Sequence, residues 1–212
     1  MSDSIFVPPP PQAVVLFDGS SLKHWIKRGS AEPAAWPIEE GAMVSRGGDI
    51  LSRQRFQDFF LHLEFNVPDS PPEVKGQGRG NSGVFLQGRY EIQVLDSWGI
   101  SDPGRGDCGA LYNYAAPLFN ACKRPTEWQS YDAVFRAPRF DAGGRRTEKA
   151  RVTVLQSGIV IQNNIELEGQ TGGAIDQDYA SPGPLMLQDH GNLVRFRNVW
   201  IVPLPEKGAD HY

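Results

Sequence analysis

The chain of 212 residues has few cysteines, few methionines and no long hydrophobic run. Two cysteines, Cys108 and Cys122, are too few for a disulfide framework or a zinc site; we expect free thiols, with a single bridge as the alternative. The longest apolar stretches, such as 13–17, fall far short of the ~18 residues that a membrane span requires. The four histidines lie far apart, and no pair has metal-motif spacing. These absences argue against a membrane span, a disulfide scaffold and a metal site recognisable from spacing.

An excess of basic residues is also lacking. Lys and Arg number 21 against 25 Asp and Glu, which gives a formal net charge of −4. Because nucleic acids and anionic membranes are usually bound by a positive patch, we expect neither as a partner. Residues 1–12 contain a proline run at 8–11 instead of the pattern of a signal peptide, and they predict a flexible arm. Localisation is left open, and an exported mature protein fits the sequence as well as any other.

Glycine and proline are abundant, with 23 and 17 residues, which disfavours long helices. Residues 59–67 alternate between apolar and polar side chains, as a half-buried strand does. The same signal recurs between turn residues at 84–87, 90–95, 131–135, 151–155, 159–165 and 194–202. Many short strands of this kind predict an all-β, two-sheet antiparallel sandwich. We expect one domain over 13–205, a Pro-rich arm at 1–12, a tail at 206–212 and a single helical turn at 20–25.

The hairpin formed by 84–87 and 90–95 can be indexed from its turn. If Gly88-Arg89 is a two-residue turn, Phe85 lies opposite Ile92 and both face the core. Glu91 and Gln93 then share the opposite face with aliphatic residues. A carboxyl and an amide in such surroundings suit the floor of a ligand site.

Two other motifs invite a function. The dinucleotide-binding string G-x-G-x-x-G occurs at 78–83 and at 104–109, but neither copy lies between a strand and a helix, so we reject a nucleotide site. Residues 91–96 resemble in part the E-x-D-x-x-E strand of laminarinase-type glycosidases. Gln93 stands where that motif has its central acid, and Glu91 and Asp96 would face opposite sides of a regular strand. Ordinary glycoside hydrolysis by a carboxylate pair is therefore disfavoured.

Several polar and aromatic residues remain as candidates. Asp189-His190 at a strand end could be an acid/base unit in which the carboxylate orients the imidazole, or a turn stabilised by Asp189. His62 shares a strand face with Glu64, either as a polar pair in a site or as a solvated face. In the loops, Trp98, Trp128 and Tyr112 could stack against sugar rings.

The motifs together resemble the 3-keto-disaccharide hydrolase family, with matching order and spacing over nearly the whole chain after residue 13. The matching strings are Leu16-Phe17-Asp18-Gly19 with Leu22 and Trp25, Asn81-Ser82-Gly83-Val84-Phe85-Leu86, Tyr90-Glu91-Ile92-Gln93-Val94-Leu95-Asp96, Cys108-Gly109-Ala110-Leu111-Tyr112, Glu127-Trp128-Gln129 and Leu187-Gln188-Asp189-His190-Gly191. The resemblance implies a concanavalin A-like jelly-roll sandwich and activity on sugars already oxidised at C3. It also implies an upstream sugar 3-oxidoreductase as a pathway partner.

A ketone at C3 acidifies the hydrogen on C2, so a base can remove it and the C1 substituent can leave by elimination, after which water adds. This chemistry needs a base, a donor for the enolate oxygen and an acid for the leaving oxygen. We expect Glu91 and His190, with Asp189 beside the latter, to be the catalytic residues, the assignment of base and acid being open. Substrate-binding candidates are Asn81, Gln93, Gln188, Trp98 and Tyr112. No cofactor is required by the sequence, although a divalent metal could assist. The alternatives are a non-catalytic carbohydrate-binding module and an ordinary glycoside hydrolase.

Overall fold

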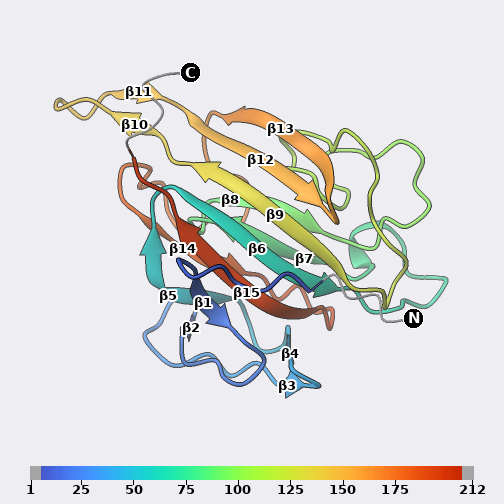
Figure 1. Ribbon diagram of the computed structural model, residues 1–212. Coiled ribbons are helices and arrows are strands. Elements are labelled where there is room, and N and C mark those ends of the chain that lie inside the picture. Colours follow the sequence, from blue (N-terminus) through green and yellow to red (C-terminus); the bar gives the residue numbers. More distant parts are fainter. Residues whose placement is uncertain (1–5, 207–212) are drawn as a thin grey trace.

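The computed structural model describes residues 6–206, and these form two antiparallel sheets packed face to face (Figure 1). The larger sheet has eight strands and the smaller has five. In Figure 1 the larger sheet lies in front, and β7 and β8 of the smaller sheet lie behind it. The all-β, two-sheet prediction is therefore confirmed. Within 6–206 no helix is long and apolar enough to cross a membrane.

The order of the strands in each sheet defines the topology. Along the larger sheet the strands are β13 (Ile159–Leu167), β12 (Ala150–Gln156), β9 (Gln129–Arg136), β6 (Phe59–Asn66), β15 (Arg195–Pro203), β4 (Ala42–Val44) and β3 (Ile38–Glu39), with β1 (Val14–Phe17) also paired to β15. Along the smaller sheet they are β2 (Trp25–Lys27), β5 (Ile50–Phe56), β14 (Gly183–Leu187), β7 (Ser82–Leu86) and β8 (Tyr90–Val94). A separate hairpin consists of β10 (Arg139–Phe140) and β11 (Arg146–Glu148), and a short 3-10 turn, η1, spans Gly76–Gly78.

The core lies between the two sheets and follows from period-two alternation. In β9 the side chains of Tyr131, Ala133 and Phe135 are fully buried, whereas Val134 between them is 43% exposed. Because successive side chains of a strand point to opposite faces, this pattern directs one face of β9 inward. The Phe135 ring contacts the Tyr90 ring of the smaller sheet, with centroids 5.3 Å apart. Aromatic contacts therefore join the two layers.

The segment predicted to form a helical turn does not do so. Residues 20–24 form bends and turns, and Trp25 begins β2. The carboxylate of Asp18 accepts hydrogen bonds from the backbone N and the Oγ of Ser20, at 2.9 and 2.6 Å. The indole of Trp25 is fully buried, and its Nε1 donates to the carbonyl of Leu16 at 2.9 Å. Pairing of β2 with β5 and burial of this tryptophan outweigh the local helix signal.

The predicted register of the β7–β8 hairpin is wrong by one residue. Leu86 pairs with Tyr90 and Phe85 pairs with Glu91, so the turn has three residues, 87–89. Gln87 adopts a left-handed conformation, with φ of 52°, and its buried amide donates to the carbonyl of Phe56 at 2.9 Å. This buried contact holds a turn that the Gly88 preference alone does not specify. Phe85 consequently lies on the outer face with Glu91, not in the core.

The predicted domain bounds can be placed on the chain. The first strand begins at Val14 and the last ends at Pro203. Of the predicted arm, residues 1–5 lie outside the described residues, as do 207–212 of the predicted tail. The carbonyl of Val7 accepts hydrogen bonds from Asn198 Nδ2 and Trp200 Nε1, at 2.9 and 3.3 Å. Residue 7 therefore lies against the larger sheet.

Phe135 and its neighbour Val134 provide a test of the core assignment. We expect Phe135→Ala to lower the free energy of unfolding by about 3–5 kcal/mol, because it removes a buried ring that bridges the sheets. Val134→Ala, on the outward side of the same strand, should cost less than about 1 kcal/mol. Urea unfolding followed by tryptophan fluorescence measures both values. Equal costs would contradict the described facing of β9.

Candidate active site

The outer face of the smaller sheet, directed away from the larger sheet, carries the polar candidates in two rows. One row crosses all five strands through paired residues: Ile26, Leu51, Met186, Phe85 and Glu91. Residues 109–112 extend this row. Leu111 forms a β-bridge with Ile92, and the backbone N–H of Tyr112 donates to the Glu91 carbonyl at 3.1 Å. Tyr112 therefore lies beside Glu91 on the same face. The structure thus brings together two of the predicted site residues.

The second row lies two residues along the same strands and so on the same face. It contains Asp49, Gln188, Gly83 and Gln93. The backbone N–H of Gln188 donates to the Gly83 carbonyl at 3.0 Å, and Gly83 pairs with Gln93 in the sheet. Gln188, which follows β14, is thereby placed in the same cluster as Glu91 although the two are far apart in sequence.

The carboxyl of Glu91 extends over β7 toward this second row. Glu91 is 4% exposed, and a Cβ built on Gly83 would lie only 2.5 Å from its Oε1. The absence of a side chain at Gly83 is therefore what leaves room for the carboxyl. Burial, and to a smaller extent the negative charge of Asp49, raises the pKa of Glu91 to about 8. At pH 7 the Glu91 side chain is mostly protonated and is a potential proton donor.

A loop between β13 and β14 covers Glu91. The Thr171 hydroxyl accepts the Glu91 backbone amide at 2.9 Å and donates to the Arg89 carbonyl at 3.2 Å. Buried Arg89 in turn donates to Asp176 at 2.6 Å and to the Ser181 carbonyl at 2.8 Å. This arginine therefore anchors the middle and the C-terminal end of the loop beside β8.

The amides of Gln93 and Asn81 are engaged within the protein. Gln93 Nε2 donates to Gln77 Oε1 at 2.8 Å, and its Oε1 accepts the Val94 amide at 3.1 Å. Asn81 Nδ2 donates to the Gln77 carbonyl at 2.8 Å. Both residues are buried and position the segment that contains η1 beside the site. Their predicted contacts with a substrate would require these groups to exchange partners.

Gln188 has an available acceptor. Its Oε1 is buried and has no hydrogen-bond partner among the residues that the structure describes. Leaving a buried carbonyl oxygen without a hydrogen-bond donor costs free energy. Such an atom is therefore suited to accept a hydrogen bond from a hydroxyl group of a ligand. Half-buried Tyr112, in the adjacent row, is also accessible.

The Asp189-His190 pair forms a turn. Asp189 Oδ2 accepts the amides of Gly47 and Gly48, at 2.8 and 2.9 Å, and Oδ1 accepts the amide of Gly191 at 3.0 Å. Partial burial opposes ionisation, but these amide hydrogen bonds prevail and lower the pKa of Asp189 below its usual value. Over 6–206 the structure records no hydrogen bond from Asp189 to the exposed His190 ring. The Asp189 carboxylate stabilises the turn, and His190 lies in it two residues after Gln188.

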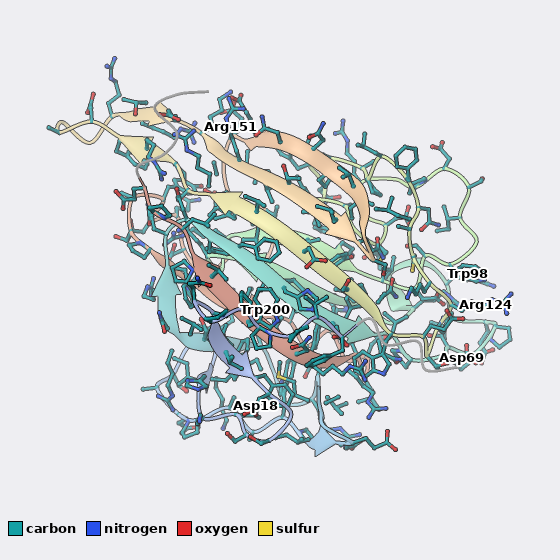
Figure 2. All side chains as sticks on the ribbon, in the orientation of Figure 1. Asp18, Asp69, Trp98, Arg124, Arg151 and Trp200 are labelled. Atoms are coloured by element: carbon teal, nitrogen blue, oxygen red, sulfur yellow. The ribbon has the colours of Figure 1, made fainter. Side chains whose placement is uncertain are left out.

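Trp98 lies at the edge of the molecule. It is 52% exposed, and the Arg124 guanidinium lies 5.3 Å from its ring centroid. Figure 2 shows the two side chains together at one end of the sandwich, far from Trp200. In the described part of the chain no recorded hydrogen bond or ring contact joins Trp98 to Glu91 or Gln188.

His62 and Glu64 lie on the other sheet, on its outer face, and both are fully buried. His62 Nδ1 and Asp132 Oδ1 are 2.7 Å apart, and Arg197 Nε donates to Glu64 at 2.6 Å. Burial lowers the pKa of His62, but the hydrogen bond to Asp132 and the nearby Glu64 outweigh this and raise it overall. The pair therefore belongs neither to a ligand site shared with Glu91 nor to a solvated face, the two alternatives that the sequence left open.

No three His, Cys, Asp or Glu side chains within 6–206 converge in a geometry able to hold a metal ion. Assistance by a divalent metal stays a prediction. Cys108 and Cys122 are both buried free thiols, as expected. Cys108 Sγ and the hydroxyl of Tyr131 are 3.2 Å apart, beneath the loop that carries Tyr112.

Sequence reasoning missed Asp49 and Thr171. Asp49 precedes a strand and Thr171 lies in a Gly-rich loop, contexts typical of any surface turn. No local pattern distinguishes them, since their importance comes from elements that pack beside Glu91 only in the folded chain.

Residues 12–202 match the family described as the 3-keto-alpha-glucoside-1,2-lyase-like domain. The chain belongs to this family. A 3-keto-disaccharide hydrolase of Bacteroides thetaiotaomicron is 24% identical over 235 residues, which cover 88% of this chain and 76% of that protein. A crystal structure described as a candidate glycosyl hydrolase of Parabacteroides distasonis is 38% identical, covers 93% of this chain and 86% of its own, and superposes with a TM-score of 0.82.

An alginate lyase bound to an alginate tetrasaccharide shares the fold alone, with 6% identity and a TM-score of 0.50 over 94% of this chain and all of its own. The predicted family and the concanavalin A-like sandwich are thus confirmed, and family members carry hydrolase and lyase names.

The buried Glu91 carboxyl predicts a pH-dependent effect on stability. Because its pKa is raised in the folded protein, folding favours the protonated form, and stability is lost as pH rises from about 4.5, the usual value, to about 8. We expect Glu91→Gln, which removes this titration, to raise the melting temperature relative to wild type by an amount that grows across that range. Differential scanning calorimetry at several pH values measures it.

Glu73→Gln, at an exposed loop position, is the matched control and should show no such trend. A melting-temperature difference for Glu91→Gln that does not change with pH would contradict the described burial.

Proposed function

We propose that this protein cleaves 3-keto glycosides by elimination and hydration. A base removes the proton from C2, the C1–O bond breaks as a C1=C2 double bond forms, and the leaving oxygen is protonated. Water then adds across the double bond, placing a hydroxyl on C1 and a hydrogen on C2. Net hydrolysis follows without a closely spaced carboxylate pair.

The observation that carries the proposal is the buried, mostly protonated Glu91 carboxyl on a sheet face with Tyr112 and Gln188. A carboxylic acid with a pKa near 8 can hold a proton at neutral pH and release it to a departing oxygen. We assign Glu91 as the general acid. His190, exposed in the turn two residues after Gln188, is assigned as the base that removes the C2 proton.

Gln188 and Tyr112 are assigned to substrate binding. The Oε1 of Gln188, which has no hydrogen-bond partner within residues 6–206, accepts a hydrogen bond from a sugar hydroxyl. The half-buried Tyr112 ring beside Glu91 contacts the sugar face. The substrate must be supplied by an oxidoreductase that converts a sugar C3 hydroxyl to a ketone, because elimination and hydration leave the oxidation state of C3 unchanged.

Paired substrates test both the reaction and the roles of the two residues. Wild type should release the aglycone from 4-nitrophenyl and methyl 3-keto-glucosides and leave the parent glucosides intact. Glu91→Gln should lower kcat by roughly 10²- to 10⁴-fold on the methyl glycoside, whose alkoxide needs a proton, and much less on the nitrophenyl glycoside. His190→Gln should slow both equally. Product release is followed by absorbance and chromatography, with Glu73→Gln as control.

Turnover of the parent glucosides would instead indicate an ordinary glycosidase, and binding without any turnover would indicate a carbohydrate-binding module. Equal losses on both keto substrates for Glu91→Gln would reverse the assignment of acid and base.

The pH profile gives a second test. If Glu91 must be protonated in the free enzyme, kcat/KM for the methyl 3-keto-glucoside should fall as pH rises past about 8. With the nitrophenyl glycoside this alkaline decline should be weak, since its leaving group needs no acid. An alkaline decline of the same size for both substrates would count against the acid role.

A further inference from the structure

Asp49 lies directly before β5, in the row of residues that adjoins Glu91 on the smaller sheet. Its carboxylate is mostly buried, with 14% of the side chain exposed. Oδ1 accepts the Asp189 amide at 2.9 Å, and Oδ2 pairs with Arg28 Nη1 at 2.8 Å. Both oxygens are therefore engaged, one by the His190 turn and the other by a cation.

The contact between Asp49 and the turn is reciprocated. The Asp189 carboxylate accepts the amides of Gly47 and Gly48, directly before Asp49 in the chain. The carboxylates of Asp49 and Asp189 thus join the segments 47–49 and 189–191 by hydrogen bonds in both directions. Gln188 and His190 flank Asp189, so their positions depend on these hydrogen bonds.

Arg28 extends the arrangement to the loop that covers Glu91. Its Nη1 pairs with Asp49, and its Nη2 donates to the Ala174 carbonyl at 3.0 Å. This loop holds the Glu91 amide through Thr171. One ion pair therefore connects the covering loop, β5 and the His190 turn.

We propose that Asp49 is a positioning residue of this site, whose carboxylate fixes the turn bearing Gln188 and His190 while its negative charge acts on the Glu91 carboxyl. The inference rests on the proposed function for its effect on turnover, but its effect on Glu91 can be measured without substrate. Like charge favours the neutral acid, and the adjacent Arg28 offsets part of that influence.

Other charged groups lie on the elements that pack beside Glu91. Asp189 and His190 lie on the turn after β14, and Arg89 with Asp176 lies at the β7–β8 turn and its covering loop. Asp49 is the one among them whose charge raises the pKa of Glu91. Asp189 directs its oxygens at backbone amides, and Arg89 is paired with Asp176.

Two substitutions of opposite sign provide the test. Asp49→Asn keeps an oxygen for the Asp189 amide and removes the charge, so the midpoint of Glu91 titration should fall by about half a pH unit or more. Arg28→Gln leaves Asp49 uncompensated, so the midpoint should rise. The carboxyl ¹³C chemical shift of Glu91, assigned by its loss in Glu91→Gln, reports the titration in the free protein.

Measurements of activity separate the effect of the Asp49 charge from the effect of its hydrogen bond to the His190 turn. Asp49→Asn should move the alkaline decline of kcat/KM to lower pH with little loss of kcat at pH 6, whereas Asp49→Ala should also lower kcat by about tenfold or more because the turn loosens. Asp141→Asn is the matched control, since Asp141 also accepts backbone amides but lies in the β10–β11 hairpin.

An unchanged Glu91 midpoint in Asp49→Asn, or shifts of the same sign in Asp49→Asn and Arg28→Gln, would overturn the inference. Opposite shifts in a protein that fails to cleave either keto glycoside would support the positioning role of Asp49 and refute the proposed function. If Asp49→Asn does not fold, Arg28→Gln alone decides, because it leaves the Asp49 carboxylate in place.

Discussion

Burial of one carboxyl is the constraint on which the site depends. Glu91 is held over Gly83, where a methyl group would collide with it, and is covered by the loop that Thr171 joins to the strand backbone. Removing a carboxyl from water disfavours its charged form, so its pKa rises toward the neutral range. In the proposed function, the burial that lowers stability at this position also supplies the proton donor, as is common where function and stability compete.

The walls of the site are held by buried polar side chains more than by regular secondary structure. Arg89 anchors the covering loop, Gln93 anchors the segment that contains η1, and the Asp49 and Asp189 carboxylates join two turns. Such contacts have defined geometry because each buried donor must find its acceptor. They let irregular loops position side chains to an accuracy that loop sequence alone does not provide.

The two sheets bury polar residues for different reasons. On the larger sheet His62, Asp132, Glu64 and Arg197 pair with one another, so their charges are largely balanced. On the smaller sheet Glu91 has no cation paired with it, and Gln188 Oε1 has no donor among the residues that the structure describes. Buried polar atoms that lack a partner within residues 6–206 also occur on the larger sheet, for example Gln129 Nε2 and Gln156 Oε1. The uncompensated Glu91 carboxyl is therefore what distinguishes the candidate site from the paired cluster on the larger sheet.

The sequence by itself determined the all-β class, most of the long strands, the family and the side chains with suitable chemistry, because alternation and motif order are local properties of the chain. It also placed Glu91, Gln188 and His190 among the candidates. Tertiary structure alone decided the hairpin register, since the buried Gln87 contact holds a three-residue turn and moves Phe85 to the outer face. Only the fold, likewise, could bring Asp49 and Thr171 to Glu91, because these residues meet through strand pairing and loop packing over long sequence separations, which no local pattern records.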